Sequence, residues 1–182
     1  NSQAMQLAQA LGEPAEVATV HNNRGIVLRD SGRAPAALDE LEQALDVDRG
    51  IGSRWGEGYD LRNIGMTYLE LGRIEAARSN LERARDVSRS IGDRVNEAKA
   101  VVSLGDALLE LGDAAGAVTA FRDAQALADE LGVVEVRWRA QWGVGRALAT
   151  LERGDEALAA LESAVDTVES MRASLEIGRA HV

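Results

Sequence analysis

The side chains best suited to catalysis are scarce in this 182-residue chain. It has two histidines, His21 and His181, and no cysteine, which excludes disulfides, thiolate metal sites and a cysteine nucleophile. The sequence contains no phosphate-binding loop, no zinc-ligand spacing and no nucleophile motif. The acidic side chains around Asp39 and Glu42 are expected on a solvated helix face. We therefore predict a protein that is not an enzyme and that has no cofactor and no metal.

Charged side chains are abundant, and their balance is acidic. The chain has 20 Lys and Arg against 30 Asp and Glu, a formal net charge of −10 and a pI near 4.7. Nucleic acids and anionic membranes require a basic face, so neither is expected as a partner. No apolar run approaches the roughly 18 residues of a membrane span. The absence of cysteine fits a reducing compartment, and we expect a cytoplasmic protein.

The elements that position these side chains recur at a step of 40 residues. Glycine inside a helix costs about 1 kcal/mol relative to alanine, so four glycines in phase predict that each meets another backbone at close range. The pattern predicts a stacked helical repeat. The recurring positions are Gly25, Gly65, Gly105 and Gly145; Ala37, Ala77, Ala117 and Ala157; Leu41, Leu81, Phe121 and Leu161; and Ala44, Ala84, Ala124 and Ala164.

Each repeat is expected to be a pair of helices. Residues 1–12 are predicted to be the second helix of a truncated preceding repeat, and full repeats follow at 13–52, 53–92, 93–132 and 133–172. Pro14 and Pro35 suit helix starts, and Ser53 and Asp93 suit N-caps. The turn inside each repeat contains a glycine, except in the fourth, where Glu152 stands in its place.

The 40-residue step lapses in the tail, at 173–182. Residues 177–182 resemble the in-frame translation of a common sequencing adapter, so we expect that they are not native and we place no weight on His181. His21 shares its repeat position with Leu61 and Val101, so we expect it to pack between helices. We expect the chain to be a fragment of a longer protein.

Several spacings resemble the tetratricopeptide signature over about 13–172. They are Ile64-Gly65-x-x-Tyr68, Leu104-Gly105-x-x-Leu108, Ala77-x-x-x-Leu81 and Ala117-x-x-x-Phe121. A repeat of 40 residues, instead of the usual length of about 34, resembles those of kinesin light chains, Leu-Gly-Asn-type adaptors and bacterial regulators. HEAT repeats overlap in length but lack these spacings. The resemblance implies an all-α, right-handed superhelical solenoid of antiparallel helix pairs, whose first helices line a concave groove.

That geometry nominates groove residues at fixed offsets from each repeat glycine. Amides at Asn23 and Asn63 could hold a peptide backbone or instead bridge adjacent helices, and the third and fourth repeats depart from the pattern with Ser103 and Gly143. Cations could hold acidic groups or pair with nearby Asp30, Glu70 and Glu110. Trp142 could anchor a peptide or pack in the core, whereas Trp55 and Trp138 are expected to pack on the adjacent repeat. The candidate peptide-binding residues are Asn23, Tyr59, Arg62, Asn63, Met66, Lys99, Arg139, Trp142 and Arg146.

The sequence therefore predicts a non-catalytic interaction module, or scaffold, that binds a peptide segment in its groove, with acidic peptides favoured. An alternative function is the regulatory or sensor arm of a larger bacterial signalling protein, such as a CHAT-type protease, an NTPase or a transcription regulator. A short stretch, 168–175, resembles the segment that joins tetratricopeptide arrays to CHAT domains. Self-association through exposed repeat ends is a third hypothesis.

Overall fold

A computed structural model of the chain describes residues 13–180, with side chains to residue 174. The half repeat predicted at 1–12 and residues 181–182 lie outside this range. Residues 13–180 form eight helices and no strands. The helices are α2 (Pro14–Asp30), α3 (Ala34–Gly50), α4 (Arg54–Glu70), α5 (Ile74–Ser90), α6 (Arg94–Glu110), α7 (Ala114–Leu131), α8 (Val134–Thr150) and α9 (Gly154–Ala180).

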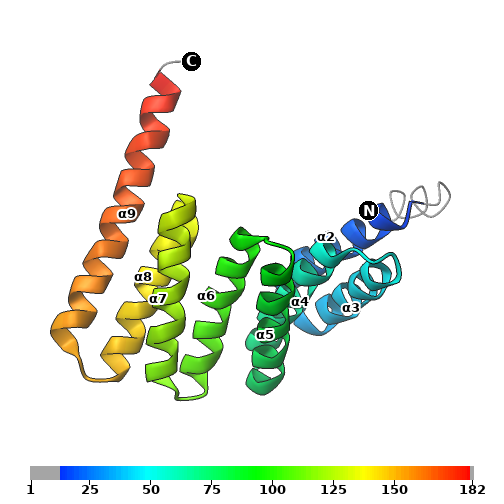
Figure 1. Cartoon of the computed structure of the whole chain (residues 1–182), viewed down its shortest axis with the longest axis horizontal. Coiled ribbons are helices and arrows are strands. Elements are labelled where there is room, and N and C mark those ends of the chain that lie inside the picture. Colours follow the sequence, from blue (N-terminus) through cyan, green and yellow to red (C-terminus); the bar gives the residue numbers. More distant parts are fainter. Residues whose placement is uncertain (1–12, 181–182) are drawn as a thin grey trace.

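The helices stack in sequence order as an open array (Figure 1). Each helix packs against the one before it and the one after it, and α2, α4, α6 and α8 also contact one another in series. The predicted all-α solenoid of antiparallel helix pairs is confirmed. We propose the ranges 13–52, 53–92, 93–132 and 133–172 as its repeats. Within residues 13–180, no helix combines the length and the apolar character needed to cross a membrane.

Local sequence explains where the helices begin. Pro14 and Pro35 lie in the first two positions of α2 and α3, as predicted. The side chains of Ser53 and Asp93 cap α4 and α6. Each accepts a hydrogen bond from the backbone N–H of the residue three positions later, at 3.1 and 3.0 Å. Asp113 caps α7 in the same way, at 2.8 Å. Each cap satisfies a backbone donor that the first helical turn would leave free.

The turn inside the fourth repeat is unusual. The equivalent turn of the third repeat has Gly112 at φ 81°, in the left-handed region that favours glycine. Glu152 occupies this position in the fourth repeat at φ 58°, and it is the only non-glycine residue with positive φ among those the structure describes. A side chain in this conformation costs roughly 1–2 kcal/mol. The last repeat therefore departs from its neighbours in its turn as well as in its sequence.

Three of the four repeat glycines meet a backbone carbonyl at close range, as expected, and all four meet a side chain of the partner helix at still shorter range. A Cβ at Gly65 would lie 2.6 Å from Leu81 Cγ and 3.3 Å from the Ala77 carbonyl oxygen. The nearest neighbour is thus the large residue of the partner helix, and the backbone is second. The same holds for Gly25 and Gly145. The alanines and leucines of the second helices therefore recur at the same step as the glycines because they pack against them.

Phe121 is the largest side chain that is fully buried in the described chain. Its ring lies against two glycines, Gly105 on α6 and Gly143 on α8. A Cβ at Gly143 would lie only 2.4 Å from Phe121 Cε1. Gly143 interrupts the predicted series of amides because the Phe121 ring occupies the space that a side chain would need.

Candidate functional site

All nine candidate residues lie on α2, α4, α6 and α8, the first helices of the four repeats. These helices contact one another in series, so the residues share one layer of the solenoid. The structure does not bring all of them to one place. It divides eight of them among a pocket between α6 and α8, a polar network around α4, and a second pocket between α2 and α4, and Lys99 stands apart on α6.

The pocket between α6 and α8 has a volume of about 210 Å³. It brings together three predicted residues, all on α8: Arg139, Trp142 and Arg146. Trp142 is 48% exposed, so the alternative that it is a core residue is wrong. An exposed indole beside two guanidinium groups can offer apolar area and paired hydrogen bonds to one ligand. The remaining lining residues are Val102, Asp106, Trp138 and Gly143.

The charged side chains of the α6–α8 pocket are positive on balance, with two arginines against one aspartate. Arg146 Nη1 donates to Asp106 Oδ1 at 3.0 Å. Burial raises the pKa of the Asp106 carboxyl, and the charges of Arg146 and Arg139 act in the opposite direction. Among the described residues, Arg139 forms no ion pair. Two guanidinium groups therefore face one carboxyl whose ionisation is disfavoured by burial.

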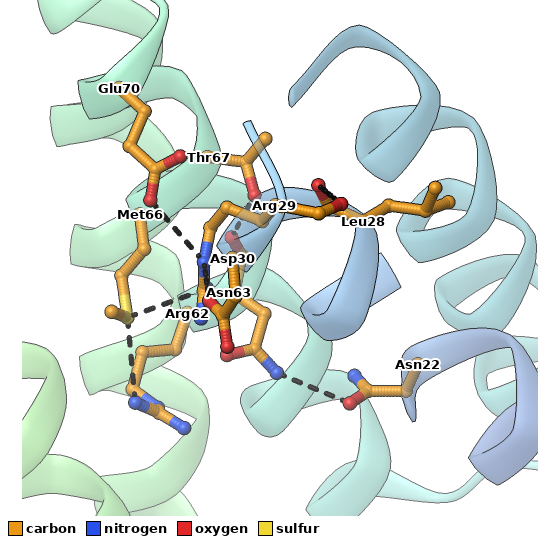
Figure 2. A network of polar contacts seen from close by, with 10 residues as sticks. Asn22, Leu28, Arg29, Asp30, Arg62, Asn63, Met66, Thr67 and Glu70 are labelled. Atoms are coloured by element: carbon orange, nitrogen blue, oxygen red, sulfur yellow. Dashed lines mark hydrogen bonds and ion pairs between the residues drawn. The ribbon is translucent and has the colours of Figure 1, made fainter. Parts of the chain in front are cut away.

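Arg62 belongs to the wall of the solenoid and is only 8% exposed. Its Nε donates to Asn96 Oδ1 at 3.0 Å, and its guanidinium lies 5.0 Å from the centroid of the Tyr59 ring. Figure 2 shows that Arg62 and Arg29 both reach the sulfur of Met66, at 3.6 and 4.0 Å. Burial lowers the pKa of the Arg62 guanidinium, and the Tyr59 ring opposes this shift. Arg62 is therefore a packed cation, whereas Lys99 is half-buried on α6.

The two predicted amides have different environments. Asn63 is 2% exposed, and its Nδ2 donates to Asn22 Oδ1 at 3.3 Å, as Figure 2 shows. Asn22 in turn donates to Asp60 Oδ1. Asn63 thus bridges α4 and α2, which was one of the two alternatives for these amides. Asn23 is exposed and lines the second pocket, so the structure does not place the two amides side by side in one groove.

The pocket between α2 and α4 has a volume of about 190 Å³ and contains residues that the sequence did not single out. Trp55 was expected to pack on the adjacent repeat. Instead it is 61% exposed and stacks on Tyr59, with 5.4 Å between ring centroids and 12° between planes. Asp48 and Asp60 also line this pocket. The other lining residues are Ala18, Thr19, Asn22, Asn23 and Gly56.

Asp48 and Asp60 are both buried, at 8% and 2% exposed. Burial raises the pKa of Asp60 to about 8; the Asn22 hydrogen bond opposes this shift, and the neighbouring Asp48 adds to it. Burial also raises the pKa of Asp48. The repeat register was the signal that could have found this pair. The equivalent positions hold Ser88 and Ala128 for Asp48, and Ala100 and Ala140 for Asp60.

His21 lies between helices, as predicted. It is 8% exposed, and its Nδ1 is 2.8 Å from Glu40 Oε2. Arg24 contacts the other oxygen of the same carboxyl, also at 2.8 Å. These contacts join α2 to α3 and give His21 a structural role. Over the described range, no three histidine or acidic side chains gather in a way that could hold a metal ion.

Comparison with known proteins supports the fold. Residues 60–130 match the tetratricopeptide repeat family. The chain resembles aspartyl phosphate phosphatase F from Bacillus subtilis, at 13% identity and a TM-score of 0.81, over 87% of this chain and 42% of that one. It also resembles a putative kinesin light chain with TPR-like repeats from Podospora anserina, at 15% identity and a TM-score of 0.69, over 93% of this chain and 84% of that one.

A third similar structure is a Rap protein complexed with competence and sporulation factor, at 18% identity and a TM-score of 0.72. The match covers 86% of this chain and 42% of the Rap protein, so this chain spans about two fifths of both Rap and the phosphatase. A search of curated protein sequences finds no match.

These findings define the class of protein. The described residues form an α-helical solenoid whose fold is like that of solved structures with TPR-like repeats, among them a putative kinesin light chain. Residues 60–130 carry the repeats of the tetratricopeptide family. Such repeats are generally non-catalytic scaffolds, and their stacking produces the extended concave surfaces that support protein–protein interaction.

Proposed function

We propose that this chain is a non-catalytic interaction module that binds a peptide segment of a partner protein along α2, α4, α6 and α8. The observation that carries this proposal is the pocket between α6 and α8. There Arg139 and Arg146 flank the exposed indole of Trp142. Guanidinium groups bind carboxylates through paired, charge-assisted hydrogen bonds, and an aromatic anchor supplies much of the free energy of peptide binding. The favoured ligand of this pocket is an acidic stretch next to an apolar side chain.

The acidity of the whole protein gives this pocket selectivity. With a net charge of −10, most of the surface repels an acidic peptide. Only a locally positive site can hold such a peptide, so the pocket fixes where it binds. The Rap protein similar to this chain is a precedent for a similar fold in complex with another molecule, competence and sporulation factor. A cytoplasmic location fits this role and the absence of cysteine.

Peptides that differ only in charge test the proposal. We would measure fluorescence anisotropy for labelled peptides of equal length that carry three glutamates, three glutamines or three lysines around one leucine. The glutamate peptide should bind most tightly. Replacing Arg139 and Arg146 by Glu should weaken its binding about ten-fold or more, because each charged hydrogen bond contributes roughly 1.5–3 kcal/mol.

A matched double variant controls for the loss of positive charge. Arg83 on α5 and Arg122 on α7 are exposed on the second helices of their repeats. Replacing both by Glu changes the net charge equally and should alter the affinity less than two-fold. Equal weakening by the two double variants would show a general charge effect, and the proposal for the α6–α8 pocket would fail.

A regulatory arm of a larger signalling protein is the second candidate function. It is favoured by the likeness to the phosphatase and the Rap protein, each of which is more than twice as long as the matched region. In this case the peptide bound by the solenoid would control a domain outside it. The complete reading frame would decide, since it would show whether a catalytic or DNA-binding domain adjoins the repeats.

A further inference from the structure

Asp48 and Asp60 place two carboxyls where the next two interfaces between repeats bury small, uncharged residues. The Asp48 position holds Ser88 and Ala128, which are 1% and 0% exposed. The Asp60 position holds Ala100 and Ala140, both 0% exposed. Two later interfaces of the same solenoid therefore form without carboxyls at these positions. The repeat fold by itself therefore does not require carboxyls at these two positions.

The carboxyl of Asp60 is only partly satisfied by the protein. Its Oδ1 accepts from Asn22, but its Oδ2 is buried and finds no hydrogen-bond donor in the described chain. The neighbouring polar group is the carboxyl of Asp48, so a second acid occupies the place of a counter-charge. Asp48 in turn lies directly against the backbone of α4, because a Cβ at Gly56 would be 1.9 Å from its Oδ2. Burying acids without a cation is costly, and a ligand with positive charge would relieve that cost.

The walls of this pocket suit the same kind of ligand. Trp55 is 61% exposed, so most of its indole is accessible to a ligand. It stacks on Tyr59, whose ring also contacts the Arg62 guanidinium. Aromatic faces attract cations, most strongly for tryptophan. The exposed amide of Asn23 at the same pocket adds a group that can accept a hydrogen bond from a cation.

We propose that the pocket formed by Asp48, Asp60, Trp55 and Asn23 binds the cationic head of an arginine or lysine side chain of the partner peptide. This inference rests on the proposed function and extends it. The module would bind a basic residue between α2 and α4 and an acidic stretch between α6 and α8. The two pockets favour ligand groups of opposite charge, so they also fix the direction in which the peptide lies along the array.

Arginine and its neutral isostere provide a direct test. We would titrate the ¹⁵N-labelled protein with Nα-acetyl-arginine methylamide and with Nα-acetyl-citrulline methylamide, following the indole N–H signals of the three tryptophans. The arginine compound should shift the Trp55 signal saturably, with at least five-fold higher affinity than the citrulline compound. Equal affinities would overturn the proposal, because a cation would then have no advantage.

The repeats themselves supply the matched variant. Asp48→Ser with Asp60→Ala installs the pair that the next interface carries, at Ser88 and Ala100, so the variant should fold. It should lose the arginine-dependent shift of Trp55 and keep the Trp142 signal unchanged. A second variant, Trp55→Ala, alters only an exposed side chain and is read from the Gly56 amide. It should weaken arginine binding at least three-fold, and unchanged affinity in both variants would contradict the site.

The same spectra separate the two proposals. The glutamate peptide used above reports at Trp142, and the arginine compound reports at Trp55. A Trp142 response without a Trp55 response would leave the proposed function intact and overturn the cation site. A Trp55 response alone would support the cation site and show that the α6–α8 pocket does not bind acidic peptides.

Discussion

At the scale of single residues, the most unusual group is Asp60. It is 2% exposed, hydrogen-bonded to Asn22 and adjacent to a second buried acid. Burial is the largest cause that raises its pKa to about 8, far above the ordinary value of 3.8. The folded protein therefore keeps a proton at neutral pH that the unfolded chain has already released. Stability must then depend on pH in a way that belongs to this side chain.

The sign of that dependence is opposite to the usual one for an aspartate. Between about pH 4 and pH 8 the folded state binds one more proton than the unfolded state, so the free energy of unfolding falls as the pH rises. We predict that Asp60→Asn removes this fall, since an amide cannot ionise. Between pH 5 and pH 8 the wild type should lose roughly 2–4 kcal/mol relative to Asp60→Asn, at about 1.4 kcal/mol per pH unit.

Urea unfolding at several pH values, with the exposed Asp39→Asn as control, measures this effect. The control should keep the pH dependence of the wild type. A difference between wild type and Asp60→Asn that does not change with pH would show that Asp60 is ionised in the folded protein throughout this range.

At the scale of helices, one repeat packs on the next by placing a large side chain of one helix against a small residue of the facing helix. Phe121 on α7 fills the space above both Gly105 and Gly143. The other repeats have leucine at the Phe121 position, and they have Asn23, Asn63 and Ser103 at the position of Gly143. The larger ring thus accompanies the smallest possible residue on the facing helix. The interface between α7 and α8 therefore depends on this pair.

We predict that Gly143→Ala destabilises the protein by about 1–3 kcal/mol, because the new methyl group would overlap the Phe121 ring. In a Phe121→Leu background the same change should cost at least about 1 kcal/mol less. A double-mutant cycle by urea unfolding measures this coupling. Gly154→Ala is the control, since a Cβ there meets nothing within 4 Å, and it should be neutral or stabilising. Additive effects of the two changes would mean that the ring and the glycine do not interact.

At the scale of the whole molecule, the array has an exposed apolar surface on its last helix. Leu158 and Val165 on α9 are 58% and 52% exposed. Their equivalents in the first repeat, Leu38 and Leu45, are 8% and 7% exposed and belong to a core shared with α4. The same side chains that join one repeat to the next thus lack a partner on α9 in the described structure. Figure 1 shows α9 at the end of the stack, extending past the other helices.

We propose that this surface mediates self-association. Replacing Leu158 and Val165 by Glu should raise the dissociation constant of the oligomer at least ten-fold, because it places charge where apolar area would be buried. Sedimentation equilibrium over a range of concentrations measures it. The control replaces Ile51 and Ile91 by Glu, two partly exposed residues in turns between repeats, and should leave association unchanged. A wild-type chain that stays monomeric at high concentration would contradict the proposal.

The sequence by itself was sufficient for the fold. The 40-residue step and the phase of the glycines and alanines predicted the helix pairs, and Ser53 and Asp93 were correctly predicted as caps. The prediction works because helix periodicity and capping depend on local sequence, and the same local pattern recurs in each repeat. The register also placed all nine candidate residues on the first helices. What a repeat position determines is therefore the element and the layer to which a side chain belongs.

Only the tertiary structure decided which of these side chains can meet a ligand. Asn23 and Asn63 occupy the same repeat position, yet Asn23 is exposed and Asn63 is bonded to Asn22 on the neighbouring helix. Arg62 and Trp142 are likewise equivalent, and one is packed in the wall while the other is exposed in a pocket. Register gives the direction of a side chain, but its accessibility depends on neighbours about 40 residues away. These neighbours differ between repeats, and for this reason the acid pair under Trp55 became evident only in three dimensions.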